Sequence, residues 1–275
     1  MRLSGRCKLL VPGALLALLG ACQVPPHVAA PPGAPAPAPA PAAAPQAGAP
    51  YEVVPDASLL TILVYRAGAL ASVGHNHVIA SHELGGTLYV ASDELQSSFE
   101  LHIPVATLTV DEAGLRASES AADFPPDVSE GAREGTRRNM LGAALLDGAH
   151  SPEIVLRAVR LEPAAAPAPG GTAGTRAVLA QVESTIRGQQ RTFSVPVCYR
   201  LADGMLSAAG DFPLRQSDLG LTPFSAMLGA LQVQDEMRIR FRLVARRAPL
   251  AGALSASPAP PAARPPDTPC AAPRA

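Results

Sequence analysis

Strict alternation of apolar and polar side chains is the feature that most restricts how this chain can fold. Two runs, residues 97–105 and 235–247, place every second side chain on an apolar face and the others on a polar face. This period of two is typical of a β-strand with one buried and one wetted side. The second run carries arginines on its polar face, and we expect them to be solvated. The apolar positions that we expect to face inward include Phe99, Leu101, Ile103, Met237, Ile239 and Phe241.

Six more segments carry strand-like patterns, separated by Asp-Gly, Gly-Gly and proline-rich breaks. Residues 130–146 lack the alternation and hold apolar residues at helical spacing, which predicts one sizeable helix. A sheet of about eight antiparallel strands removes its exposed edges by closing on itself. The sequence therefore predicts a mainly β fold, an antiparallel β-barrel that can hold one small ligand. The six segments span residues 58–65, 86–90, 153–161, 177–186, 191–199 and 205–212.

Proline divides the chain into folded and unfolded parts. Of the 30 prolines, 10 fall in residues 25–50 and 8 in residues 249–273, mostly among alanine and glycine. Segments of this composition cannot bury a core and stay extended. We therefore expect a tether over residues 22–50, one folded domain over residues 51–247 and a disordered tail over residues 248–275.

The N-terminus predicts export and a lipid anchor. A basic start precedes the apolar run of residues 9–19, which is too short to span a bilayer and is typical of a secretory signal. The run ends in Leu-Gly-Ala-Cys, which resembles the bacterial lipobox. This resemblance implies a signal peptide over residues 1–21 and acylation of Cys22 by palmitate-type chains. Because Gln23 and not aspartate follows, it also implies the bacterial outer membrane, with the protein facing the periplasm. The alternative is an ordinary secretion signal that leaves Cys22 free.

The charge and the cysteines narrow the range of partners. A formal net charge of −1 and a pI near 6.6 provide no basic field, so we expect no nucleic acid partner. Cys198 and Cys270 could pair in an oxidising compartment, but Cys270 falls in the proline-rich tail, and we expect no obligatory disulfide. Neither cysteine has a neighbouring histidine in sequence, which disfavours a thiol enzyme.

The tetrapeptide Gly-His-Asn-His at residues 74–77 raises the question of a metal site. If the segment is extended, His75 and His77 project to the same face. Zinc needs a third and usually a fourth ligand, and His82 has the wrong parity to supply one. We therefore expect neither a metal nor a cofactor, and interpret the two histidines as structural or ligand-contacting. The letters of an HNH nuclease motif are also present, but in that motif the residues are widely spaced.

Four motifs follow one another in an order that resembles the YceI-like domain family, from about Ser58 to Ala245. The resemblance implies a lipocalin-like periplasmic β-barrel that binds polyisoprenoid or other long-chain amphiphilic molecules. The chain departs from the family in its few aromatic residues, 4% with no tryptophan, and in an inserted loop at residues 163–175. The motifs are GHNHVIASHELGGTLYV at residues 74–90, the segments RNML, LLD and SPEI within residues 138–154, VESTIRGQQRTFSVPV at residues 182–197, and QSDLGL at residues 216–221.

Together these features predict a lipid-anchored, non-enzymatic binding protein of the periplasm. It would sequester or carry an apolar amphiphile, such as a polyisoprenoid, a quinone-like molecule or a fatty molecule. The residues expected to contact the ligand are His75, His77 and the six inward apolar residues named above. Two alternatives stay open, namely a metal-dependent hydrolytic enzyme centred on His75 and His77, and a ligand-free envelope interaction module.

Overall fold

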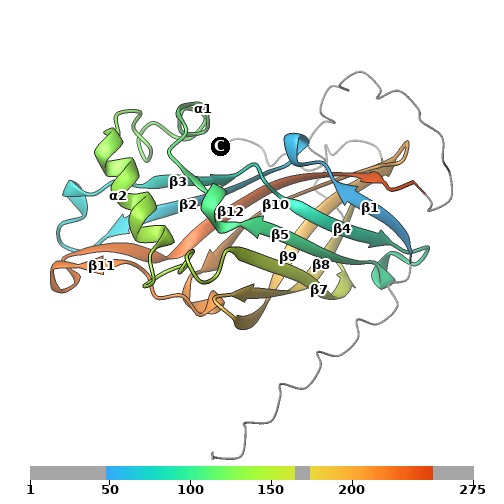
Figure 1. Cartoon of the computed structure of the whole chain (residues 1–275). Helices are drawn as coiled ribbons and strands as arrows, with labels where there is room; N and C mark the ends of the chain where they lie inside the picture. Colours follow the sequence, from blue (N-terminus) through green and yellow to red (C-terminus); the bar gives the residue numbers. More distant parts are fainter. Residues whose placement is uncertain (1–47, 165–173, 250–275) are drawn as a thin grey trace, which may run out of the picture. The chain divides into compact units, whose positions relative to one another are not determined.

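The computed structural model describes residues 48–164 and 174–249 of the 275-residue chain, and β-strands dominate this part (Figure 1). The predicted signal peptide, most of the tether and nearly all of the tail lie outside the described residues. The same holds for Cys22, for Cys270 and for most of the inserted loop. Within the described ranges, no helix is both long enough and apolar enough to cross a membrane.

The predicted mainly β fold is confirmed, and each predicted strand is present with ends that differ by a few residues. The sequence prediction missed four short strands, namely Ala49–Val53, His77–Ser81, Thr109–Val110 and Ser225–Ala226. The predicted helix begins at Glu130 as expected but ends at Leu141, because the residues that follow form turns. The strands are β1 Ala49–Val53, β2 Leu59–Ala67, β3 His77–Ser81, β4 Gly85–Val90, β5 Ser98–Pro104, β6 Thr109–Val110, β7 Glu153–Pro163, β8 Arg176–Ile186, β9 Gln189–Ala202, β10 Met205–Arg215, β11 Ser225–Ala226 and β12 Leu231–Arg247, and the helices are α1 Ala113–Ala117 and α2 Glu130–Leu141.

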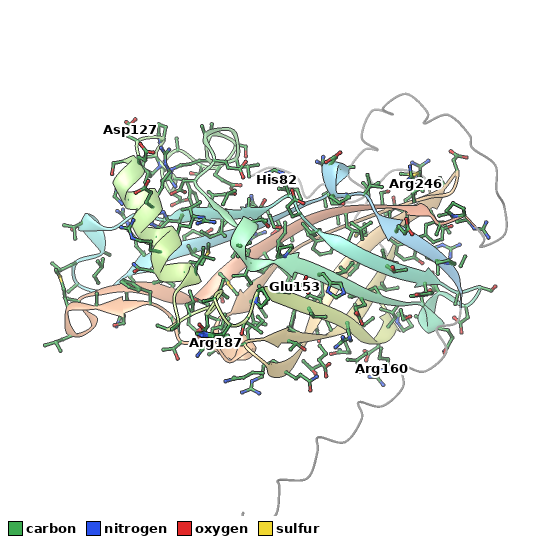
Figure 2. All side chains as sticks on the ribbon, in the orientation of Figure 1. His82, Asp127, Glu153, Arg160, Arg187 and Arg246 are labelled. Carbon is green, nitrogen blue, oxygen red and sulfur yellow. The ribbon has the colours of Figure 1, made fainter. Side chains whose placement is uncertain are left out.

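Eight antiparallel strands close into a barrel in the order β1, β4, β5, β7, β8, β9, β10 and β12. Pairing of β1 with β12, in which Tyr51 lies opposite Arg247, joins the two ends of the sheet. Closure leaves these strands without a free edge, as the strand number had predicted. Charged side chains such as Arg160 and Arg246 stand on the outside of the ring (Figure 2).

A break between β1 and β2 lets the long strand β12 belong to two parts of the sheet. Pro55 begins a short 3-10 turn, Pro55–Ala57, that interrupts the extended backbone. Ser58 repairs the hydrogen bonding at the break, because its Oγ accepts from the backbone N–H of Val244 at 3.0 Å and donates to the carbonyl of Val54 at 2.8 Å. β2 then continues along β12, and β3 and β6 add to it as an extension of the sheet beyond the barrel ring.

Helix α2 lies against this extension (Figure 1). Its N-cap is Ser129, whose Oγ accepts a hydrogen bond from the backbone N–H of Ala132 at 3.3 Å. Met140 near its C-terminal end is buried in the main hydrophobic core, together with Leu146 from the turns that follow. The helix and these turns therefore join the extension to the barrel core.

A separate, small core covers the outer face of β2 and β3. Leu63 and Val78 each have an exposed fraction of 1%, and they pack with Phe124 from the segment that follows α1. The ring of Tyr65 meets the ring of Phe124 edge-on at a centroid distance of 5.6 Å. The segment from α1 to α2 thus acts as a lid on a sheet face that would otherwise be apolar and exposed.

One expectation about the outside of the barrel needs correction. The arginines of β12 are not simply solvated, because Arg240 pairs with Glu119 at 2.6 Å and Arg238 pairs with Asp211 at 2.5 Å. Glu119, from the segment between α1 and α2, and Asp211, from β10, reach this face. The alternation within β12 cannot predict these partners, because they lie elsewhere in the chain. Cys198 is disulfide-bonded, and that the fold does not depend on this bond stays a prediction.

Candidate ligand-binding cavity

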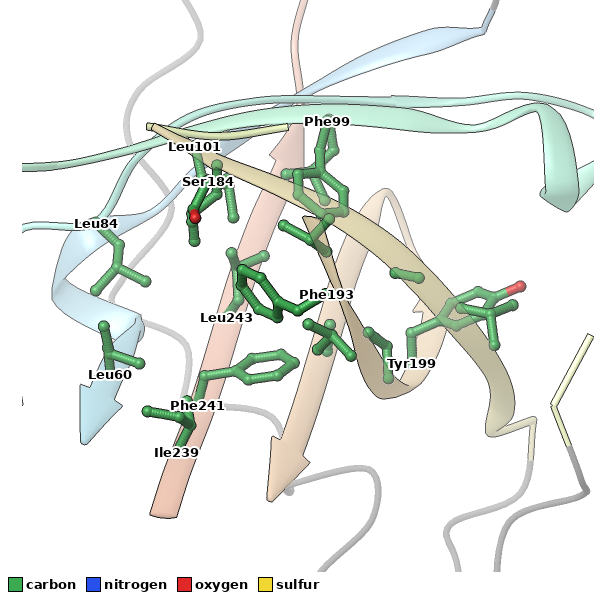
Figure 3. Close-up of a pocket in the computed structure, with 18 of the residues that line it drawn as sticks. Leu60, Leu84, Phe99, Leu101, Ser184, Phe193, Tyr199, Ile239, Phe241 and Leu243 are labelled. Carbon is green, nitrogen blue, oxygen red and sulfur yellow. The ribbon is translucent and has the colours of Figure 1, made fainter. Parts of the chain in front are cut away.

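The inward side chains of the barrel do not fill its interior. They enclose a cavity of about 250 Å³, to which β2, β4, β5, β7, β8, β9, β10 and β12 contribute (Figure 3). For comparison, an apolar cavity of ~150 Å³ in a protein core holds a benzene molecule. The apolar lining residues are Leu60, Ile62, Leu84, Leu88, Val90, Phe99, Leu101, Ile103, Ile154, Leu156, Leu161, Val178, Ala180, Val182, Ile186, Phe193, Val195, Val197, Leu206, Ala208, Phe212, Leu214, Leu219, Met237, Ile239, Phe241 and Leu243.

All six inward residues predicted from the alternation of β5 and β12 line this cavity. Sequence reasoning missed most of the remaining lining, although the same period of two marks it on β8, β9 and β10. Whether any of these side chains contacts a ligand stays a prediction, because alternation identifies an inward face and not a binding role.

Small inward residues explain why space remains inside the ring. Ala180 and Ser184 on β8 and Ala208 on β10 line the cavity and are almost fully buried. Gly210 follows on β10, directly opposite Phe241 of β12. A Cβ at Gly210 would lie 2.4 Å from Cε1 of Phe241, so the absence of a side chain lets the ring lie against β10. These positions supply little volume to a core that large side chains would fill.

Polar groups gather at one end of the cavity. Glu94 belongs to the 3-10 turn η3, Glu94–Gln96, between β4 and β5. Its carboxylate accepts a hydrogen bond from the hydroxyl of Tyr199 and pairs with Nη1 of Arg176 at 3.1 Å. Glu94 and Tyr199 both line the cavity, while the side chain of Glu94 is 41% exposed. The cavity therefore reaches solvent here, and we call Glu94, Arg176 and Tyr199 the rim cluster. In Figure 3 Tyr199 lies at the opposite end of the drawn lining from Leu60 and Leu84.

The rim cluster has perturbed acid-base properties. Burial and the hydrogen bond to the negatively charged Glu94 raise the pKa of Tyr199 to about 12. The hydrogen bond from Tyr199, together with the contacts from Arg176, lowers the pKa of Glu94 despite its partial burial. At neutral pH the cluster thus consists of a carboxylate, a guanidinium and a neutral phenol.

His75 and His77 do not line the cavity. The reason is that β3 begins at His77 and belongs to the sheet extension and not to the barrel ring, while His75 precedes the strand. The two rings lie 6.0 Å apart, and burial together with the neighbouring His77 lowers the pKa of His75. The six inward apolar residues of β5 and β12 thus line the cavity, whereas these two histidines lie outside its lining.

His77 belongs to a buried hydrogen-bonded cluster. Its Nδ1 lies 2.7 Å from Oδ2 of Asp111, and its Nε2 lies 3.0 Å from the hydroxyl of Thr136 on α2. The other carboxylate oxygen of Asp111 accepts from Nη1 of Arg116 at 2.7 Å and from the backbone N–H of Val78 at 2.9 Å. The side chains of Asp111 and Arg116 are 0% and 3% exposed. The cluster thus connects β3, α1 and α2.

Asp111 is ionised at the centre of this cluster. Burial alone would raise the pKa of its carboxyl group, but hydrogen bonds from His77 and Val78 and the charges of His77 and Arg116 outweigh burial and lower the pKa. Its φ of 54° lies in the left-handed region, which aspartate tolerates better than most residues. Sequence reasoning missed Asp111, Arg116 and Thr136, because they lie 34 to 59 residues from His77 in the chain.

The described residues contain no group of three or more His, Cys, Asp or Glu side chains that could hold a metal ion. His82 and His102 instead pair with acidic side chains on the surface, Glu112 and Glu100 respectively. The metal-dependent alternative built on His75 and His77 therefore finds no further ligand among residues 48–164 and 174–249.

An eight-stranded antiparallel barrel around an apolar cavity defines the class of small barrels that enclose a ligand. The YceI-like domain model matches residues 51–245, and the chain belongs to this family. Solved structures with a similar fold include BcnA of Burkholderia cenocepacia, at 17% identity, with a TM-score of 0.47 over 70% of this chain and 98% of that one. A polyisoprenoid binding domain from Saccharophagus degradans has 11% identity and a TM-score of 0.46 over 72% and 98%. The YceI protein of Campylobacter jejuni has 7% identity and a TM-score of 0.41 over 62% and 85%. The curated proteins yield no match.

Proposed function

We propose that this protein is a non-enzymatic binding protein whose barrel holds the apolar chain of an amphiphile, such as a polyisoprenoid, a quinone-like molecule or a fatty molecule. The observation that carries the proposal is the cavity, whose lining is apolar except near the rim cluster and at Ser184. The ligand class that the YceI-like family implies is consistent with this lining.

The physical basis is transfer of a chain from water to a preformed apolar space. Each methylene that leaves water contributes ~0.8 kcal/mol, whereas a polar group without a hydrogen-bond partner loses free energy on the same transfer. A cavity lined by leucine, isoleucine, valine and phenylalanine therefore selects chains of carbon and rejects polar molecules. Its volume of about 250 Å³ holds only part of a long chain, so a long ligand requires the barrel to expand or extends through the rim.

A hydrolytic role is disfavoured by the position of the buried cluster around His77. Thr136, His77 and Asp111 form a chain of hydroxyl, imidazole and carboxylate, the order that hydrolases with a nucleophilic hydroxyl use. None of the three side chains lines the cavity, and Arg116 shares the carboxylate. We interpret this cluster as a structural connection between α2 and the sheet.

The test of the binding proposal is mass spectrometry of organic extracts from the full chain carrying Cys22→Ser, whose barrel is wild type and which can be purified from a periplasm without detergent. We expect a stoichiometric long-chain lipid in the wild-type sample. The variant Ala180→Leu, which adds volume to the cavity lining, should lose it. Thr192→Leu, the same kind of enlargement on the exposed face of β9, should retain it. Wild-type protein that carries no lipid and binds none added to it would refute the proposal.

We also propose that Cys22 is lipidated and anchors the protein to a membrane of the bacterial envelope, with the barrel in the periplasm. The lipobox-like sequence at residues 19–22 and the proline-rich composition that follows support this. Cys22→Ser should release the protein into the soluble fraction while the barrel stays folded. Fractionation followed by circular dichroism checks both points, and continued membrane association of the variant would contradict the anchor.

A further inference from the structure

The rim cluster joins the turn between β4 and β5 to the paired strands β8 and β9 at one end of the cavity. Arg176 and Tyr199 lie directly opposite each other on the paired strands β8 and β9. Both follow the inward parity of their strands, since Val178 and Val197 next to them line the cavity. Glu94 comes from the turn between β4 and β5, and in the ring β7 separates β5 from β8. The three polar side chains therefore meet where a ligand would enter with its chain first.

The two charged side chains of the rim cluster differ in their exposure to solvent. The guanidinium of Arg176 is 67% exposed, whereas Glu94 is 41% exposed and lines the cavity itself. A ligand head at the rim therefore meets the carboxylate at closer range than it meets the guanidinium. Both contacts of Glu94 use Oε2, and a carboxylate carries a second acceptor oxygen.

We infer that the rim cluster is a head-group site that favours a neutral, hydroxyl-bearing head over an anionic one, so that the barrel prefers a long-chain alcohol to a carboxylate of the same length. The inference rests on the proposed function, because it needs a chain in the cavity. A hydroxyl donates to the carboxylate of Glu94 and accepts from the guanidinium of Arg176, so both of its roles are used. An anionic head has no proton to donate to Glu94 and is repelled by it.

The acid-base state of the cluster supports this assignment. Glu94 has a lowered pKa, so it remains a carboxylate at neutral pH and cannot donate a hydrogen bond to an anionic head. Tyr199 stays neutral up to about pH 12 and already donates its hydroxyl proton to Glu94. Arg176 is thus the only member of the cluster with donors left for an anion, and its exposure to water weakens that attraction.

The experiment measures how well 1-hexadecanol and palmitate displace a fluorescent apolar probe at neutral pH from the soluble full chain carrying Cys22→Ser, whose barrel is wild type. Two like charges at the partly exposed rim disfavour the carboxylate by about tenfold or more in affinity, and we expect wild type to prefer the alcohol by that factor. Glu94→Gln keeps the size of the side chain and removes its charge. It should raise the affinity for palmitate by about tenfold while it changes the affinity for the alcohol by less than about threefold.

Two further variants separate the head-group role from general effects. Glu100→Gln removes a carboxylate that pairs with Arg157 at 2.6 Å on the outer face of β5, so it should keep the wild-type preference. Arg176→Gln removes the positive charge at the rim and should widen the preference for the alcohol. Circular dichroism and urea unfolding of each variant establish that the fold is retained.

The outcomes distinguish this inference from the function on which it rests. If wild type does not bind the apolar probe or either compound, binding of apolar chains itself is refuted. If the probe binds and neither compound displaces it, the head-group inference is refuted. If both bind wild type with equal affinity, or if Glu94→Gln shifts both affinities by the same factor, the barrel binds chains but the rim does not select the head. An equal shift of both affinities in Glu94→Gln is the result expected if Glu94 and Tyr199 only hold the β4–β5 turn in place.

Discussion

Replacing Asp111 with asparagine should remove the charge at the centre of the buried cluster while it keeps the local backbone. Asparagine tolerates the left-handed φ of 54° at this position, so the change tests the charge and not the turn. The variant leaves Arg116, whose side chain is 3% exposed, without the carboxylate that lies 2.7 Å away. Arg116 still donates to the carbonyl oxygens of Pro125 and Asn76, at 2.7 and 2.8 Å, but these neutral groups do not compensate its charge as a carboxylate does.

The expected cost follows from the burial of both partners. Loss of one member of a buried ion pair costs about 3 to 5 kcal/mol, because the other charge remains away from water without compensation. A domain of this kind has about 5 to 15 kcal/mol of stability in total, so the variant should stay folded with a much smaller margin. With a urea m-value of about 2 kcal/mol/M, a loss of about 4 kcal/mol lowers the unfolding midpoint by about 2 M.

Equilibrium urea unfolding, followed by far-ultraviolet circular dichroism, measures this shift. The matched control is Glu134→Gln, because Glu134 pairs with Arg138 at 3.6 Å on α2 with both side chains mostly exposed. That exposed pair should contribute at most about 0.5 kcal/mol. The double variant with Arg116→Met should recover part of the loss, because it removes the unpaired charge as well. A cost below about 1 kcal/mol for Asp111→Asn would refute the argument that this carboxylate stabilises the fold through Arg116.

Three further predictions concern the same barrel. Because the pKa of Asp111 is lowered in the folded state, its contribution to stability is present above its ordinary pKa of 3.8 and is lost as the pH falls through the lower folded value. The free energy of unfolding of Asp111→Asn should therefore depend less steeply on pH in acid than that of the wild type. Gly210→Ala should cost about 1 to 3 kcal/mol in urea unfolding, because its Cβ would lie 2.4 Å from Phe241, whereas Gly85→Ala meets nothing within 4 Å and should change little. The ultraviolet difference titration between wild type and Tyr199→Phe should have its midpoint near pH 12, and a midpoint near pH 10 would show that the rim contacts are absent. Because the pKa of this phenol is raised in the folded state, its contribution to stability is present below pH 10 and declines as the pH rises towards 12.

The barrel was predictable because its strands obey a local rule. In β5, β8 and β12 the identity of each residue depends on which side of the sheet it faces, and that information repeats every two residues. β3 was not predictable in this way. All of its five residues are buried, because the lid segment covers one face and the core covers the other. A strand that is buried on both faces loses the alternation that would identify it.

The buried cluster could not be predicted from sequence, because its members share no local pattern. In the sequence His77 stands beside His75, yet its partners in the fold are Asp111 and Thr136, which lie on other segments. A buried arginine such as Arg116 also has no signal in composition, since arginine is mostly exposed in folded proteins. The rim cluster has the same origin, since Glu94 and Tyr199 are 105 residues apart in the chain. Closure of the sheet brings the rim cluster together, whereas packing of α1 and α2 on the sheet extension assembles the buried cluster. Both depend on the whole fold and not on a local pattern.

Whether a closed barrel is filled or hollow depends on which apolar residues occupy its inward positions, and alternation alone does not distinguish these cases. Phe99 and Phe241 would contribute to a filled core as well as to a cavity lining. The small residues decide, because Ala180, Ala208 and Gly210 occupy inward positions of the ring where larger side chains would close the space. Enlarging one of them leaves the period of two intact while it removes volume from the cavity. The fold of this barrel and its capacity for a ligand are therefore encoded by separable features of the same strands.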